Sequence, residues 1–135
     1  MEEKEKKYQI TLTEDQMRLV SNALEDWSRF VAGQCEMEFA TSLVYDSRKV
    51  KDILHDQVKP AMFPELALNE SYGWSGSTCK NDFQRKAIAM SYMLYREIIH
   101  YLTVNNGKDM SWSTYNSPTL TCPEQGPLIK IEEVK

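Results

Sequence analysis

Hydrophobic residues recur at steps of three and four along three stretches of the chain, which is the spacing of one helix face. The first stretch begins at a capping box, in which the side chains of Thr13 and Gln16 each accept a hydrogen bond from the other's backbone N–H. Gly33 lies inside this stretch, where it predicts either a kink or a close approach of the backbone to a neighbour or ligand. We therefore expect one long helix from residue 13 to about residue 43. Its apolar face consists of Met17, Val20, Leu24, Trp27 and Val31.

The other two stretches predict a shorter helix and a second long one. Asp46 or Ser47 caps the shorter helix, which we expect to stop at Lys59-Pro60 because the residue before a proline avoids the helical region. Asn81 or Asp82 caps the long helix, and Asn105-Asn-Gly107 is a typical helix end. The apolar faces consist of Val50, Ile53, Leu54 and Val58 in the shorter helix, and of Phe83, Ala87, Met90, Leu94, Ile98, Tyr101 and Leu102 in the long one.

Two short segments near the ends of the chain alternate apolar and polar residues, the pattern of a β-strand. They are residues 8–12 and 128–131. Pairing them would give a small two-stranded sheet that joins the termini. The expected fold is therefore mainly α (α+β), with two long helices, one shorter helix and this sheet. A disordered tail over residues 1–7 precedes a single helical domain over residues 8–135.

The composition narrows the classes of protein that fit. A chain of 135 residues with 41% hydrophobic and 27% charged residues fits one globular domain. A net charge of −4 makes nucleic acid an unlikely partner. No apolar run is long enough to span a membrane, and the first residues lack the apolar segment of a secretory leader, so we expect a cytoplasmic protein. Its three cysteines are then expected to be reduced.

The first long helix carries further apolar residues beside its main face. They are Leu19, Ala23, Phe30, Met37 and Phe39. A monomer would expose much of this surface to water, and large exposed apolar patches mark interaction sites. We therefore expect a homo-oligomer.

Candidate chemistry is concentrated on the third helix. The sequence holds no HExxH, CxxC, phosphate-binding loop or GxGxxG, so we expect no catalysis, no metal and no other cofactor. Tyr92, Arg96 and His100 follow one another at four-residue steps, which predicts that they share one flank of the helix. A phenol, a guanidinium and an imidazole together suit an anionic or aromatic small molecule. The alternative is a partly buried polar seam between helices.

The loop over residues 60–80 is the second candidate region, because long loops inside compact domains are often functional. Its aromatic residues Tyr72 and Trp74 either stack on the base of a ligand or close one end of the helical core. Gln34 and Lys130 would join the same site if the chain folds to bring them near the third helix.

Five strings, in this order and at this spacing, resemble a family of short, largely uncharacterised proteins of tailed bacteriophages. They are Ile10-Thr-Leu-Thr13, Gly33-Gln34 with Glu36, Ser71-Tyr-Gly73, Tyr92-x-Leu94 with Ile98-x-His100-x-Leu102, and Gly126-Pro-Leu-x-Lys-Ile-Glu132. The chain departs from the family's pattern at Cys35, Tyr101 and Ser117. The resemblance implies a phage-encoded protein that acts in the bacterial host cell, where several small phage proteins counter host defence.

The function that these observations favour is an anti-defence sponge, a non-catalytic protein that sequesters a nucleotide-type immune signalling molecule. Its expected ligand-binding residues are Gln34, Tyr72, Trp74, Tyr92, Arg96, His100 and Lys130. Two alternatives remain open at this point: a protein-binding inhibitor of a host enzyme or defence protein, and an enzyme whose motif is not recognised.

Overall fold

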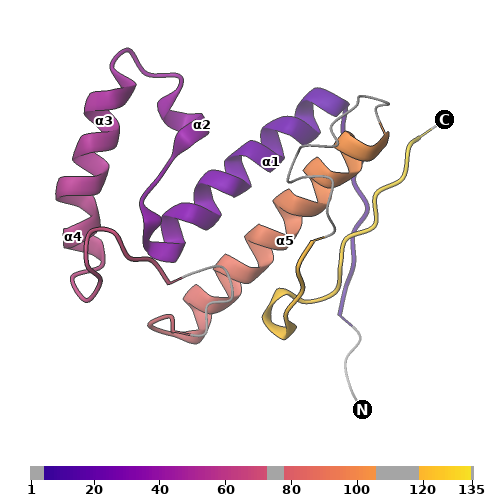
Figure 1. Cartoon of the computed structure of the whole chain (residues 1–135). Helices are drawn as coiled ribbons and strands as arrows, with labels where there is room; N and C mark the ends of the chain where they lie inside the picture. Colours follow the sequence, from indigo (N-terminus) through magenta and orange to yellow (C-terminus); the bar gives the residue numbers. More distant parts are fainter. Residues whose placement is uncertain (1–4, 73–77, 106–118, 135) are drawn as a thin grey trace.

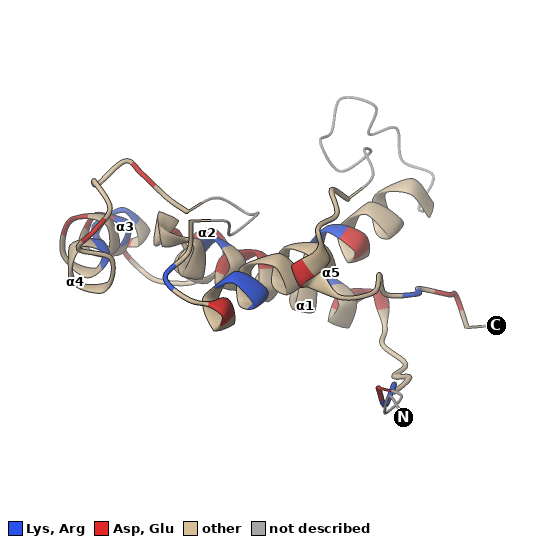
Figure 2. Cartoon of the chain, turned by 90° about the horizontal axis from the view of Figure 1, so that it is seen from below, with Lys and Arg blue, Asp and Glu red and all other residues tan. Residues whose placement is uncertain are grey.

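The structure is a computed structural model that describes residues 5–72, 78–105 and 119–134 (Figure 1). Two long helices lie side by side and run in opposite directions, while three short helices form a group beyond one end of the first. The chain is elongated, and Lys and Arg are interspersed with Asp and Glu along its helices (Figure 2). The helices are α1 (Glu14–Arg29), α2 (Glu38–Thr41), α3 (Ser47–Ile53), α4 (Lys59–Met62) and α5 (Asp82–Asn105).

Helix α1 begins where the sequence predicts and ends earlier. The Thr13 N–H donates to Gln16 Oε1 at 2.9 Å and the Gln16 N–H donates to Thr13 Oγ1 at 3.2 Å, which confirms the capping box. The predicted continuation to residue 43 is wrong. The chain continues into a π-helical turn, η1 (Phe30–Gln34). The backbone is left-handed at Gly33 inside this turn, with φ of +90°, and at Cys35 directly after it, with φ of +54°. Two positive φ angles so close together cannot be accommodated in a right-handed helix.

The second helix extends beyond its predicted end. Asp46 caps α3 by accepting from the Lys49 N–H at 3.0 Å. The expected stop at Lys59-Pro60 is wrong, because helical structure continues through a π turn, η2 (Leu54–Val58), into α4, which contains Pro60. The Lys59 N–H bonds the Leu54 carbonyl five residues earlier. This wider turn accommodates Pro60, which has no N–H to donate.

The third helix matches its predicted bounds. Asn81 Oδ1 accepts from the Gln84 N–H at 2.8 Å, which identifies Asn81 as the cap, and α5 ends at Asn105. The residues of the predicted stop signal after Asn105 lie outside the described part of the chain. Neither α5 nor any other described helix is both long and apolar enough to cross a membrane.

The predicted two-stranded sheet is wrong, so the described part of the chain is helical rather than α+β. Residues 8–12 and 128–131 are extended, yet no strand is assigned among the described residues and no backbone hydrogen bond joins these two segments. The side chains of Tyr8 and Ile10 lie exposed rather than packed on the helices. A two-stranded pair on its own is only marginally stable in water, so alternation over so few residues does not produce one.

The two long helices pack through small and polar residues of α1. Ser21, Glu25 and Ser28 are buried there, and Ser21 Oγ donates to the Tyr95 carbonyl of α5 at 3.1 Å. The apolar face predicted to be buried is not the one that α5 covers, since Trp27 in its middle is 51% exposed. Small side chains let two helices approach closely, so shape rather than hydrophobicity selects the buried face.

A compact core forms where α1 ends and α5 begins. It consists of Ala32, Cys35, Phe63, Tyr72, Cys79 and Ile88. The Tyr72 N–H donates to the Ala32 carbonyl at 2.7 Å, which fixes the loop after α4 against the end of α1. On the outer side of α1, the buried Asp26 carboxylate accepts from the N–H groups of Phe39 at 3.1 Å and Ala40 at 2.7 Å. These contacts hold the short helices to α1.

Candidate functional site

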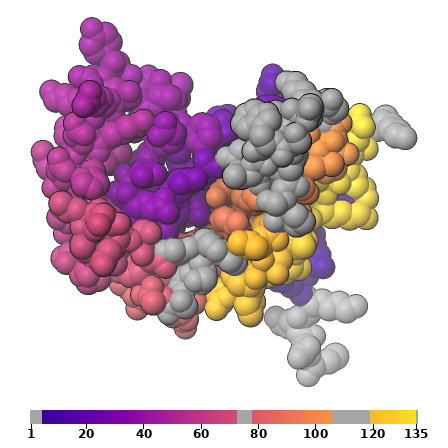
Figure 3. Space-filling view, in the orientation of Figure 1, coloured from indigo at the N-terminus to yellow at the C-terminus, as the bar shows by residue number. Residues whose placement is uncertain are grey.

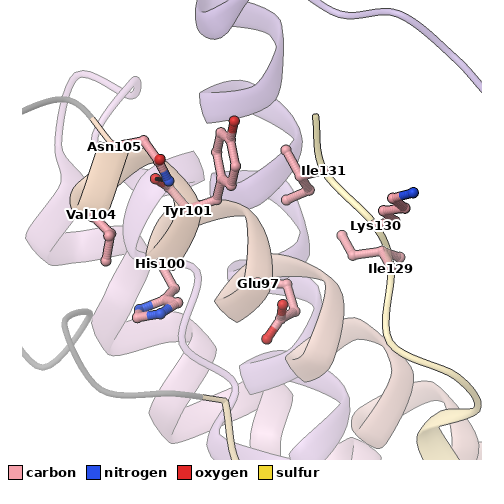
Figure 4. A pocket seen from close by; sticks show the side chains of 8 residues that line it. All are labelled: Glu97, His100, Tyr101, Val104, Asn105, Ile129, Lys130 and Ile131. Atoms are coloured by element: carbon pink, nitrogen blue, oxygen red, sulfur yellow. Dashed lines mark hydrogen bonds between the residues drawn. The ribbon is translucent and has the colours of Figure 1, made fainter. Parts of the chain in front are cut away.

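A cleft of about 380 Å³ lies between the last turns of α5 and the C-terminal segment (Figure 4). This volume is within the range of small-molecule sites in proteins. The cleft is lined by Glu97, His100, Tyr101, Val104 and Asn105 from α5, and by Ile129, Lys130 and Ile131 from the C-terminal segment.

The residues of α5 that line the cleft lie on one face of the helix. The lining residues of α5 follow at steps of three, one, three and one, so they share a face of an α-helix. The side chain of Asn105 is fixed at the end of this face, because its Nδ2 donates to the Tyr101 carbonyl at 2.8 Å. An extended segment alternates its side chains, so Ile129 and Ile131 point towards α5 while Lys130 points away (Figure 4).

The polar groups in the cleft are a carboxylate, an imidazole, a phenol and an amide, from Glu97, His100, Tyr101 and Asn105. The ammonium of Lys130 is instead paired with Glu132, with Nζ and Oε1 2.8 Å apart. The hydrogen bond to the Glu132 carboxylate, together with its negative charge, raises the pKa of Lys130. Lys130 therefore contributes its backbone and the base of its side chain to the cleft rather than its charge.

Of the three residues expected on one flank of α5, only His100 lines the cleft. Each step of four residues rotates a side chain by about 40° round the helix axis, so Tyr92 lies about 80° away from His100. Arg96 is only 7% exposed and belongs to the packed part of α5. The ring of Tyr92 packs edge-on against Tyr95, with centroids 5.5 Å apart. This placement favours the polar-seam alternative for Tyr92 and Arg96.

Two other predicted ligand residues, Tyr72 and Gln34, lie away from the cleft. Tyr72 is in the core beside Ile88, which is roughly 18 Å along α5 from His100. Its phenol donates to the Glu65 carboxylate, and burial, followed by this hydrogen bond, raises the pKa of Tyr72 to about 12. Gln34 accepts from Arg29 Nη1 at 3.4 Å at the end of α1. Trp74 lies outside the described residues.

Sequence reasoning missed six residues that line the cleft. They are Glu97, Tyr101, Val104, Asn105, Ile129 and Ile131. The signal on the helix was the spacing of Glu97, His100, Tyr101 and Val104, which keeps side chains together better than four-residue steps do. Tyr101 instead appeared to belong to the buried face, and the two isoleucines appeared to belong to a strand.

The described residues contain no group of three or more His, Cys, Asp or Glu side chains that could hold a metal ion. Comparison with known proteins adds no relative: no protein-family model, no curated protein and no solved structure matches this chain. The chemistry of the cleft and the strings quoted above are therefore the basis for a functional proposal.

The cysteines lie apart from the cleft and are not activated. Cys35, Cys79 and Cys122 are free thiols, and burial is the main cause that raises the pKa of each. A raised pKa lowers the thiolate fraction at neutral pH, and the thiolate is the reactive form. We expect iodoacetamide at pH 7.5 to modify Cys35 and Cys79 in the folded protein at least about tenfold more slowly than in the unfolded chain.

Peptide mass spectrometry over a time course measures these rates, with the half-buried Cys122 as the internal comparison. After unfolding without reductant, all three thiols should be modified. Equal rates in the folded and unfolded protein would contradict the burial of Cys35 and Cys79.

Proposed function

We propose that the protein is a non-catalytic binding protein of tailed-bacteriophage type that sequesters a nucleotide-type signalling molecule in the bacterial host cell. One observation carries the proposal. Two strings of the resemblance, Tyr92–Leu102 and Gly126–Glu132, are far apart in sequence, and their ends supply both walls of the cleft. We also propose that the chain acts as a homo-oligomer.

The groups in the cleft suit the sugar and base of a nucleotide better than its phosphate. A carboxylate such as Glu97 is the group that binds ribose hydroxyls in many dinucleotide sites. The phenol ring of Tyr101 and the side chains of Ile129 and Ile131 provide flat and apolar surface for a base. The imidazole of His100 adds an N–H donor for a phosphate at the edge of the cleft.

Calorimetry with cyclic dinucleotides and ADP-ribose derivatives tests this proposal. We expect the wild-type chain to bind one of these compounds, and His100→Ala to weaken binding by at least about tenfold through the loss of the imidazole's hydrogen bond and ring contact. Arg96 is unsuitable for this test, since it is buried and its removal would disturb the packing of α5. His55→Ala is the matched control, because His55 is exposed on η2 and pairs with Asp56 at 2.7 Å.

Three results would contradict the proposal. If the wild-type chain binds none of these compounds, or if His55→Ala weakens binding as much as His100→Ala does, the cleft is not the site. If chromatography recovers the ligand chemically changed, the protein is an enzyme rather than a sponge.

A second function, inhibition of a host enzyme or defence protein by direct binding, is favoured by a different observation. Large apolar side chains lie exposed on both long helices, including Trp27 and Phe83. Such surface marks an interaction site for a protein, either a copy of the same chain or another one. The oligomeric state distinguishes these two occupants.

A further inference from the structure

The apolar faces of α1 and α5 lie on the same side of the helix pair. The two helices are antiparallel, with Ser21 beside Tyr95 and the Val31 carbonyl accepting from Gln84 Nε2 at 2.9 Å. The contact face of each helix is the one that touches the other helix. On both helices the apolar face lies roughly 90–100° round the axis from the contact face, in the same direction of rotation when each helix is viewed from its N-terminus. In an antiparallel pair, equal rotations of this kind bring both faces to one side of the layer.

This two-helix apolar face contains no charged residue. It consists of Val20, Leu24 and Trp27 from α1, of Val31 from η1, and of Phe83, Ala87, Met90 and Leu94 from α5. Phe83 is 80% exposed, and Val20, Trp27 and Met90 are each exposed by more than a third. Aromatic residues and Met, with few charges, are typical of the buried centre of a protein–protein interface.

The edge of α5 that faces away from α1 is already covered. The C-terminal segment lies along this edge in Figure 3, and its 3-10 turn η4 (Pro123–Gln125) packs against that helix. Ala89 and Met93 of α5 are buried. Helical layers are stable when both apolar faces are packed against another layer, so a single chain supplies only part of the cover that this pair of helices needs.

The exposed area of the chain indicates how much surface is available for association. Its accessible surface is 9933 Å², whereas a folded monomer of 15.7 kDa exposes roughly 7,300 Å². The extended terminal segments account for part of the excess of roughly 2,600 Å². A stable dimer needs only about 800 Å² from each partner, which is less than this excess.

We propose that the two-helix apolar face is the interface with a second copy of this chain. An uncharged apolar face is complementary to itself, as a two-fold symmetric contact requires. Two such layers placed face to face form a four-helix arrangement in which the exposed Trp27 and Met90 become core residues. The inference rests on the homo-oligomer of the proposed function and identifies the surface that forms it; it does not depend on the ligand.

Sedimentation velocity of the full chain at micromolar concentration tests this interface. We expect the wild-type mass to be at least twice 15.7 kDa. The double variant Trp27→Glu/Met90→Glu should sediment as a single chain, with a dissociation constant raised at least about 100-fold, because association would bury unpaired carboxylates. Leu19→Glu is the matched control, since Leu19 is 69% exposed on the same helix and lies outside the face.

Far-UV circular dichroism establishes that each variant keeps its helices, and Val20→Glu replaces the double variant if that one does not. A wild-type chain that sediments at 15.7 kDa overturns both the interface and the homo-oligomer, and favours a different protein as the occupant. An oligomer that survives the substitutions in the face, or that Leu19→Glu dissociates equally, overturns this interface and leaves the homo-oligomer standing.

Discussion

Replacing Lys59 with Met is expected to lower the free energy of unfolding by about 3 kcal/mol. Lys59 is only 3% exposed, and its Nζ donates to the carbonyls of Leu68, at 2.8 Å, and Glu70. Methionine retains most of the apolar stem and removes both charge-assisted hydrogen bonds. Two backbone carbonyls then lose their donor, and the segment after α4 loses one of its attachments to the rest of the fold.

Urea unfolding followed by circular dichroism measures this change. Lys51→Met is the control, because Lys51 is an exposed lysine of the same helical region and pairs with Glu38 at 3.0 Å. Exposed ion pairs contribute little, so the control should cost about 0.5 kcal/mol or less. Similar losses for the two variants would show that the Lys59 contacts do not stabilise the fold.

Replacing Gly33 with Ala is expected to cost about 2 kcal/mol, for two separable reasons. The backbone at Gly33 has φ of +90°, which an L-residue adopts only with strain. A Cβ there would also lie 2.6 Å from Leu66 Cδ1, closer than carbon atoms can approach. Leu66 must therefore move away from the core that it packs against.

A double-mutant cycle separates the two causes. In a Leu66→Ala background the crowding is absent, so Gly33→Ala should cost only the backbone strain, about 1 kcal/mol. Unfolding free energies of the four chains give the result. If Gly33→Ala costs the same in both backgrounds, the close contact with Leu66 contributes nothing.

The positions of the helix starts were determined by the sequence itself. The capping box of Thr13 and Gln16, and the caps at Asp46 and Asn81, are each made between residues three apart. Such interactions depend on the chain within one turn, so the pattern of residues predicts them without knowledge of the rest of the molecule. The start of α5 follows for the same reason.

The helix ends and the buried faces were decided by the tertiary structure. Gly33 allows a kink or a straight helix, and its positive φ is adopted where the backbone passes Leu66 and Tyr72. The apolar face of α1 predicts burial against a partner, yet within one chain α5 packs on the small residues beside Ser21 instead. Hydrophobic periodicity identifies a face that favours burial; it does not identify what covers that face.

The candidate site, too, was determined partly by the sequence and partly by the tertiary structure. The sequence by itself determined that His100 lies on a long helix and that residues 128–131 are extended, both from local pattern. That these segments form two walls of one cleft was decided by the return of the C-terminal segment along α5. The structure does not bring Tyr92, Arg96 and His100 together in the cleft, because side chains at four-residue steps rotate progressively round the helix. What each of them contacts depends on the segment that packs beside it.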